Sequence, residues 1–438
     1  MNLHNKNFLS LKGFHFKIIL FLLIILYISL ILFISFVYDI NYYQVWKFFG
    51  VPAREILFSD IYPFFVNDSC KINSINTQDY YDQFKNCDAW QRLYNYMPIW
   101  IEFLKLGVHQ KYYYFFGIAF SLLFYLAFFK LIVINSKKDF FIYALAILSP
   151  PVMFGIERGN TDLFIFFLCF IYISLLQRNN IISNIFSYIL IFFSSLLKFY
   201  PIFLVFLFFK KSFWNKIFGI ATFFIFLLYV LINYSDILLI KENTQQTFFF
   251  SYGYNVLEAG LNNIFYKLNL IFFAAKNYLF GDYESFKGGI FHILYTNEFQ
   301  NSSFIFSRLF LLFIIFVFIF KNSKISDNKK IPKSHNYLFF ILGASIFCGT
   351  FALGANFDYR LIFLLFTFPY LIDLKEDNRN FLFLKNSSFI YLIIIYLWLT
   401  PFTIFTSGLD EIITWFIFMF YLEFLSIYYF DVFFKKKS

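Results

Sequence analysis

The sequence predicts an all-α membrane protein with about twelve transmembrane helices, because apolar runs near the length of a bilayer crossing recur along the chain. The 438 residues are 60% hydrophobic and only 14% charged, with a mean hydropathy of +0.67. A soluble protein of this composition would lack the polar residues needed to cover its surface. Basic residues also gather at the ends of alternate apolar runs, which is typical of polytopic membrane proteins.

The first predicted span is Ile18–Tyr38, which follows Lys6, Lys12 and Lys17. This run is too long for the apolar part of a signal peptide and lacks a small-residue cleavage site, so we expect an uncleaved span and a cytoplasmic N-terminus. The later predicted spans are Tyr112–Ile134, Phe140–Ile156, Leu163–Leu176, Ile181–Leu197, Phe199–Phe209, Ile217–Asn233, Ser303–Phe320, Tyr337–Leu353, Leu361–Ile372, Phe389–Phe405 and Glu411–Phe434.

With the N-terminus inside, this order places both termini and every basic cluster in the cytoplasm, as the positive-inside rule requires. The clusters are Lys137 and Lys138; Arg178; Lys210, Lys211 and Lys216; Lys321 to Lys333; Lys375, Arg379 and Lys385; and Lys435 to Lys437. The net charge of +10 is therefore explained by topology, and nucleic acid is not an expected partner. The lipid bilayer is an expected partner. The expected localisation is a bacterial inner or plasma membrane.

Residues 1–438 form a single predicted domain with two long extracytoplasmic loops, over residues 39–111 and 234–302. Both contain amphipathic stretches. In the second loop one helical face is apolar, which suits a helix on the membrane surface or one packed on protein. Its residues are Leu257, Leu261, Ile264, Phe265 and Leu268. A crossing helix over 264–279 would instead reverse the topology that follows.

Several middle spans are too short to cross a bilayer as straight helices. A helix over Phe199–Phe209 would cover roughly 16 Å, against about 30 Å of hydrocarbon. We therefore expect the chain to turn at Lys198–Pro201 within the membrane, and the segment before Leu163 to dip as well. Irregular backbone at this depth needs protein or a wet cavity around it, which predicts an outward-open polar cavity.

Six ionisable residues fall near these predicted breaks: the bases Arg158, Lys198 and Arg360, and the acids Glu157, Asp162 and Asp358. Charged groups at membrane depth are costly and usually mark a functional site. The three bases suit an anionic group such as a phosphate, because arginine can bind its oxygens in a bidentate fork. The acids would orient the bases or bind hydroxyls. The alternative is a structural network of buried ion pairs.

The first long loop contributes an acid and aromatic residues. Asp60 can act as a general base if a substrate hydroxyl comes within hydrogen-bond reach, or it can be a solvated loop acid. Tyr96 and Trp100 lie in an aromatic segment that suits sugar rings and equally suits the aromatic belt of a membrane protein.

Metal and covalent chemistry have little support in the sequence, whereas a disulfide between two loop cysteines is plausible in an oxidising compartment. The five histidines are scattered, and no cluster of His, Cys and carboxylates has metal-ligand spacing, so we expect neither metal nor cofactor. Cys70 and Cys87 share the first long loop. They are either free or bridged, and a bridge would contribute about 3 kcal/mol.

Five motifs recur in order across most of the chain and resemble those of GT-C membrane glycosyltransferases, more narrowly glycosyltransferase family 87. They are Phe58-Ser59-Asp60, Asn95-Tyr96-Met97-Pro98-Ile99-Trp100, Glu157-Arg158-Gly159-Asn160-Thr161-Asp162, Leu197-Lys198-Phe199-Tyr200-Pro201 and Asn356-Phe357-Asp358-Tyr359-Arg360-Leu361. One departure is Met97, where relatives tend to have proline directly after the Asn-Tyr pair.

The resemblance implies an extracytoplasmic active site and a metal-independent, inverting transfer of mannose from a polyprenyl phosphate to a glycolipid or glycan acceptor. The catalytic aspartate of the family corresponds to Asp60, which spacing alone does not distinguish from the other acids of the loop. Arg158, Lys198 and Arg360 would hold the donor phosphate. Asn160 and Tyr200 join the acids and aromatic residues as supporting, substrate-binding residues.

Three other functions fit parts of the sequence. A transporter or flippase also has broken helices with charged groups, although here the charges concentrate towards one face. A polysaccharide polymerase or ligase would consume a lipid-diphosphate oligosaccharide. A structural scaffold would leave the buried charges unexplained.

Overall fold

The computed structural model describes residues 3–65, 88, 93–178, 180–208, 213–244, 250–257, 336–374, 380–381, 384–402 and 409–433. Cys70, Cys87, the predicted span Ser303–Phe320 and most of the predicted apolar face of the second long loop lie outside these residues. The described part is predominantly helical, in agreement with the predicted fold class.

Within the described residues, helices cover the apolar runs that the sequence marks as spans. They are α1 (Leu3–Val37), α5 (Tyr113–Leu131), α6 (Lys137–Ile147), α7 (Pro150–Arg158), α8 (Thr161–Gln177), α9 (Ile181–Leu197), η3 (Tyr200–Phe208), α10 (Phe213–Ile232), α15 (Tyr337–Ala352), η5 (Asp358–Thr367), α16 (Phe368–Asp373), α17 (Phe389–Leu399) and α19 (Leu409–Phe433). The elements labelled η are 3₁₀ helices.

Within the described residues, four helices are long and apolar enough to cross a membrane. They comprise Gly13–Val37, Gln110–Leu131, Phe213–Ile232 and Asp410–Phe430. Many large apolar side chains on them are exposed, such as Phe115 on α5 and Leu228 on α10, which suits contact with lipid. The chain thus has the helices of a membrane protein, and the count of about twelve crossings stays a prediction.

The predicted span Phe140–Ile156 is two helices rather than one, because α6 and α7 meet at an angle of 48°. Two prolines, Pro150 and Pro151, begin α7 after the N-cap residue Ser149. Proline lacks an amide hydrogen and disrupts a helix interior, but it fits the first turn of a new helix. Counted as one broken span, this pair gives a fifth candidate crossing among the described residues.

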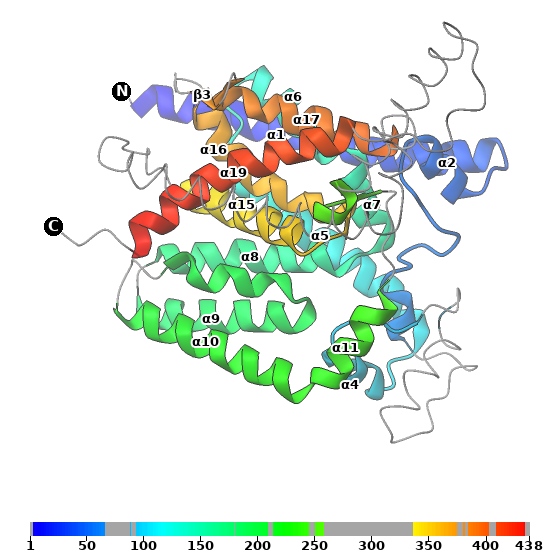
Figure 1. Cartoon of the computed structure of the whole chain (residues 1–438). Coiled ribbons are helices and arrows are strands. Elements are labelled where there is room, and N and C mark those ends of the chain that lie inside the picture. Colours follow the sequence, from blue (N-terminus) through cyan, green and yellow to red (C-terminus); the bar gives the residue numbers. More distant parts are fainter. Residues whose placement is uncertain are drawn as a thin grey trace, which may run out of the picture.

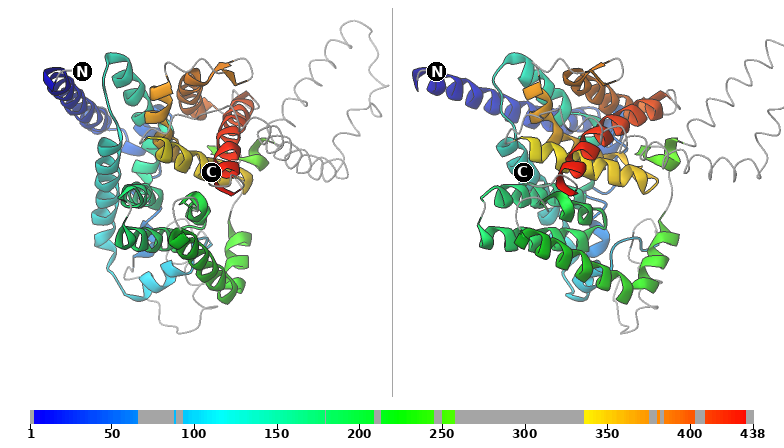
Figure 2. Two further views of the ribbon diagram at one scale, coloured as in Figure 1. Left: turned by 90° about the vertical axis from the view of Figure 1, so that its left-hand side faces the viewer. Right: turned by 60° about the vertical axis from the view of Figure 1, so that its left-hand side comes forward.

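The helices pack as a bundle in which α8 lies against both α5 and α9, and α9 lies against α10 (Figure 1). On the other side of the bundle α15 contacts η3, η5 and α19, and α19 contacts α17. The start of α1 and the end of α19 lie at the same end of the bundle in the views of Figures 1 and 2.

The described parts of the two long loops gather at the opposite end of the bundle (Figure 1). The first loop contains α2 (Tyr42–Phe48), η1 (Tyr62–Phe64) and α4 (Ile99–Lys105), and the second contains α11 (Tyr234–Asn243). Three further 3₁₀ turns are η2 (Gln110–Tyr112), η7 (Asn386–Ser388) and η8 (Thr400–Phe402).

Two short antiparallel ladders, absent from the predicted fold class, connect segments of this mostly helical chain. Strand β1 (Ser251–Tyr252) pairs with β2 (Asn356–Phe357), with Tyr252 opposite Asn356. The second ladder joins β3 (Asn380–Phe381) to β4 (Leu384–Lys385). The first ladder attaches the second long loop to the segment that carries Arg360.

Candidate functional site

A cavity of about 440 Å³ lies where the two long loops meet the ends of the helices. Segments far apart in the sequence contribute to its lining: the first loop, the end of α7, the junction of α9 with η3, the end of α11, and the stretch from α15 to η5. Asp60, Arg158, Lys198 and Arg360 all line it, as do Tyr96 and Tyr200. The three bases, which come from distant parts of the sequence, therefore border the same cavity.

Asp60 is held against the end of α7 by backbone hydrogen bonds. The amide of Phe58 donates to the carbonyl of Glu157 at 2.9 Å, and the amide of Asp60 donates to that of Arg158 at 3.1 Å. At the next residue the chain turns through Gly159, whose φ of 58° is left-handed and favours glycine. The first long loop and the helix end thus form one unit that carries both Asp60 and Arg158.

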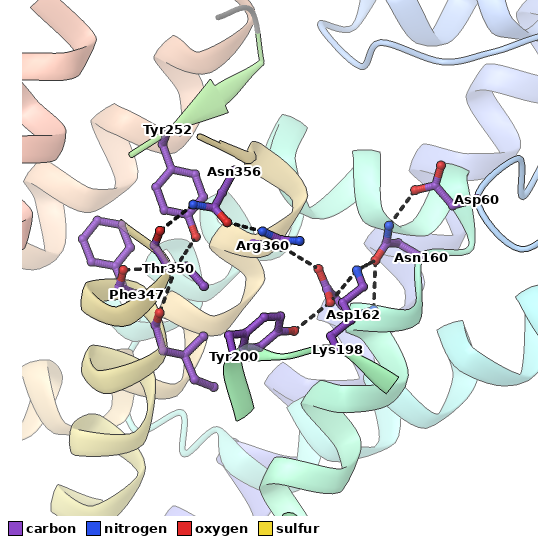
Figure 3. Close-up of polar contacts among 11 residues, drawn as sticks. Asp60, Asn160, Asp162, Lys198, Tyr200, Tyr252, Phe347, Thr350, Asn356 and Arg360 are labelled. Atoms are coloured by element: carbon purple, nitrogen blue, oxygen red, sulfur yellow. Dashed lines mark hydrogen bonds and ion pairs between the residues drawn. The ribbon is translucent and has the colours of Figure 1, made fainter. Parts of the chain in front are cut away.

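The carboxylate of Asp60 has two partners from the segment that links α7 to α8. Asn160 donates from Nδ2 to Oδ2 of Asp60 at 2.5 Å (Figure 3). Nη1 of Arg158 lies 3.6 Å from Oδ1 of Asp60. Asp60 is only 9% exposed, so these contacts act in a medium of low polarity, where they are stronger than in water.

Arg158 is fixed on several sides, mainly by the first long loop. It donates to Oγ of Ser59 at 3.1 Å and to the carbonyl of Pro52 at 2.9 Å. Its Nε lies 3.4 Å from Oε2 of Glu157, which is buried behind it and also accepts from the amide of Arg54. The guanidinium further lies over the ring of Phe154, 5.0 Å from its centre.

Lys198 follows the last residue of α9, in extended backbone, at the position where the sequence predicts a break. Its Nζ is 2.7 Å from Oδ1 of Asp162 and donates to Oδ1 of Asn160 at 2.8 Å. It also lies 5.2 Å from the centre of the Tyr359 ring. The ammonium group is therefore held at the edge of the cavity by one charged and one neutral partner.

Asp162 connects Lys198 to Arg360. Its Oδ1 accepts from the hydroxyl of Tyr200 at 2.7 Å, and Nε of Arg360 lies 3.6 Å from its Oδ2. Arg360 also donates to Oδ1 of Asn356 and lies over the ring of Tyr200. Because the ion pair with Asp162 is long and the side chain keeps 23% of its surface exposed, the guanidinium can still bind a further anion.

These contacts form a continuous polar chain across the cavity wall (Figure 3). It runs from Asp60 through Asn160, Lys198, Asp162 and Arg360 to Asn356. This series of polar contacts joins Asp60 on one side of the cavity to Lys198 and Arg360 on the other. Asn160 and Asp162 provide the connecting side chains. Such a preorganised set of charges suits a reaction in which negative charge develops on a bound group.

The second long loop supports the far end of this polar chain. The hydroxyl of Tyr252 in β1 hydrogen-bonds Oγ1 of Thr350 at 2.7 Å, and Nδ2 of Asn356 donates to the carbonyl of Thr350. Burial raises the pKa of the Tyr252 hydroxyl above its usual value. The ladder between β1 and β2 thereby fixes the side chain that holds Arg360.

Five predicted site residues among those described do not line the cavity: Glu157, Asn160, Asp162, Asp358 and Trp100. Asn160 and Asp162 contact lining residues through the polar chain described above. Glu157 is 1% exposed and contacts Arg158. Asp358 is 2% exposed, and neither of its carboxylate oxygens accepts a hydrogen bond from the described residues. Trp100 donates to the carbonyl of Leu197 at 3.2 Å and stacks on Phe64, so its ring supports the wall from outside.

Several lining residues were not predicted. Arg54, Glu242, Asn243, Asn356 and Tyr359 all border the cavity. A signal for Arg54 was present, because it is a basic residue in the loop of Asp60, which is predicted to lie on the side that the positive-inside rule leaves poor in arginine. Glu242 and Asn243 carry no such signal, since polar residues at the end of a loop helix are common.

Within the described residues, no group of three or more His, Cys, Asp or Glu side chains could hold a metal ion. The side chains that line the cavity offer carboxylate, guanidinium, ammonium, amide and phenol groups. Compared with protein-family models, curated proteins and solved structures, the chain matches none of them.

Proposed function

We propose that this protein is a membrane glycosyltransferase that moves a hexose from a polyprenyl phosphate to an acceptor hydroxyl, with Asp60 as the base. Mannose is the hexose that the resemblance to glycosyltransferase family 87 implies. The observation that carries the proposal is the presence of Asp60, Arg158, Lys198 and Arg360 around one cavity. A carboxylate beside several cations is the set of groups that displacement of a phosphate by a hydroxyl needs.

In the proposed reaction the acceptor oxygen attacks the anomeric carbon while the bond from that carbon to the donor phosphate oxygen breaks. The hydroxyl proton passes to Asp60, and the electron pair of the broken bond stays on the phosphate. The leaving polyprenyl phosphate thus gains one negative charge. Attack opposite the leaving group inverts the anomeric configuration, and no metal takes part.

The cations would stabilise the charge that the phosphate gains. Lys198 and Arg360 share Asp162, and Arg360 retains exposed surface, so both can turn their remaining donors to phosphate oxygens. Arg158, the third cation of the cavity, lies next to the proposed base Asp60 and is held in place by the first long loop. The exposed apolar helices would accommodate the polyprenyl chain.

The direct test is transfer of radiolabelled mannose from synthetic polyprenyl-phosphate mannose by purified protein in proteoliposomes. We expect Asp60→Asn to lower the rate by at least about 100-fold, the usual contribution of a general base. Asp39→Asn is the matched control, because Asp39 is an exposed acid of the same loop that does not line the cavity. Equal transfer by wild type and Asp60→Asn would refute Asp60 as the base.

One observation favours a second candidate, a polymerase or ligase that uses a lipid diphosphate. Arg54 adds a fourth basic side chain to the lining, and a diphosphate carries more charge than a monophosphate. Comparison of polyprenyl-phosphate mannose with polyprenyl-diphosphate oligosaccharide in the same assay separates the two. Faster turnover of the diphosphate would favour this candidate.

A further inference from the structure

The cavity has a second wall, formed by polar residues to which the proposed reaction assigns no role. Glu242, Asn243 and Thr244 at the end of α11 line it, together with Asn95 and Tyr96 of the first long loop. Among these five residues one is acidic, the others are neutral, and none is basic. This composition contrasts with the cationic lining formed by Arg158, Lys198 and Arg360.

Hydrogen bonds join this wall to the segment that carries Asp60. Asn243 donates from Nδ2 to the carbonyl of Tyr94 at 3.0 Å, which ties the second long loop to the first. The hydroxyl of Tyr94 donates to the carbonyl of Met97, and that of Tyr96 donates to the carbonyl of Asp60 at 3.2 Å. Ligand groups bound along this wall therefore lie beside the proposed base.

The chemistry of the wall selects against anions. A carboxylate at its edge repels a phosphate, whereas it accepts strong hydrogen bonds from hydroxyl groups. The amide of Asn95 can both donate and accept, and the half-buried ring of Tyr96 offers an apolar face. Carboxylates, amides and an aromatic face together suit the hydroxyls and the C–H face of a sugar ring.

We propose that the wall of Glu242, Asn243, Asn95 and Tyr96 is the acceptor subsite, and that the acceptor is an uncharged saccharide. One of its hydroxyls would face Asp60 while others hydrogen-bond Glu242. This inference rests on the proposed function and adds the class of acceptor to it. The side chain of Glu242 is exposed, which suits a ligand that enters from solution or from the membrane surface.

The test measures the KM of each substrate separately in proteoliposomes, with polyprenyl-phosphate mannose as donor and n-octyl α-mannoside as acceptor. Glu242→Gln keeps the shape of the side chain and removes its charge. We expect it to raise the KM for the octyl mannoside about tenfold, with the KM for the donor unchanged. It should also lower the ratio of kcat/KM for octyl mannoside to kcat/KM for its 6-phosphate. Asn243→Ala should raise the acceptor KM as well.

Lys241→Gln is the matched control, because Lys241 is the exposed neighbour of Glu242 on α11 and does not line the cavity. If wild type transfers mannose but neither Glu242→Gln nor Asn243→Ala alters the acceptor KM, the subsite is refuted and the proposed function stands. A wild-type preference for the 6-phosphate would likewise refute an uncharged acceptor and leave the proposed function standing. No turnover of the donor would refute both proposals.

Discussion

Asp60 and Asn160 are 100 residues apart in the sequence, and their side chains share a hydrogen bond of 2.5 Å between Oδ2 and Nδ2. The other end of the Asn160 amide accepts from Lys198 and from the backbone of Asp162. One amide thus connects the proposed base, a proposed phosphate ligand and the start of α8. Its two ends differ chemically, so a substitution can separate these roles.

Replacement of Asn160 by Asp should lower transfer about 100-fold with little loss of stability. Aspartate is as good an N-cap as asparagine and can still accept from Lys198, so α8 should begin as before. It cannot donate to Asp60 when ionised, and it places a second negative charge beside the base. The kcat of transfer and the thermal unfolding of the detergent-solubilised protein would be compared with those of the wild type.

The control for this change is Asn180→Asp, since Asn180 caps α9 in the same way, accepting from the amide of Ser183 at 2.7 Å outside the cavity. Full activity in Asn160→Asp would mean that the hydrogen bond to Asp60 has no role in catalysis.

Gly159→Ala should both destabilise the protein and reduce transfer. A methyl group there would lie 2.9 Å from Cβ of Phe58, and the left-handed backbone disfavours alanine. Phe58 would have to move, and Asp60 would move with it. We expect a loss of about 1–3 kcal/mol of unfolding free energy and at least a tenfold fall in kcat.

Gly107→Ala separates the two causes. Gly107 has a similar φ of 67°, but apart from its chain neighbours no atom of the described residues lies within 4 Å of the added methyl group. This variant should lose stability from backbone strain while its kcat stays unchanged. A similar loss of activity in both variants would show that contact with Phe58 is not what positions Asp60.

Asp162→Asn should be the most destabilising single change at the site. Lys198 and Arg360 both rely on this carboxylate, and a buried cation without its partner costs about 3–5 kcal/mol. Adding Lys198→Met to Asp162→Asn removes one of the two cations that have lost their carboxylate partner. The double variant should therefore regain part of the lost stability but none of the activity. A double-mutant cycle on thermal unfolding measures this coupling, and additive effects of the two changes would contradict the buried ion pair.

Trp100→Phe should lower stability without altering either KM. The indole donates to Leu197 and stacks on Phe64 at 4.2 Å between ring centres, so the substitution removes a buried hydrogen bond and packing area. We expect a loss of about 1–3 kcal/mol. Thermal unfolding and substrate kinetics check this, and a raised acceptor KM at normal stability would instead make Trp100 a sugar-binding platform. Tyr96→Ala provides the comparison, because Tyr96 lines the cavity and should raise the acceptor KM.

Much of the helical structure was predictable because apolar run length is a local property of the chain. The predicted span Ile181–Leu197 has the bounds of α9, and Tyr337–Leu353 differs from α15 by one residue. The expected break at Lys198 also agrees with the end of α9. The prediction of one straight span over Phe140–Ile156 was wrong, because Pro150 and Pro151 start a new helix within this apolar run.

The sequence by itself determined the helical membrane character, and it singled out Asp60, Arg158, Lys198 and Arg360 by their charge in apolar surroundings and by family resemblance. Only the tertiary structure decided which partners these residues have: Asn160 for Asp60, Asp162 for both Lys198 and Arg360, and Tyr252 behind Asn356. It also added Arg54 and Glu242 to the cavity and placed Trp100 outside its lining. The physical reason is that burial of a charge has a cost that local sequence reveals, whereas its compensation comes from side chains that long-range packing brings within hydrogen-bond distance.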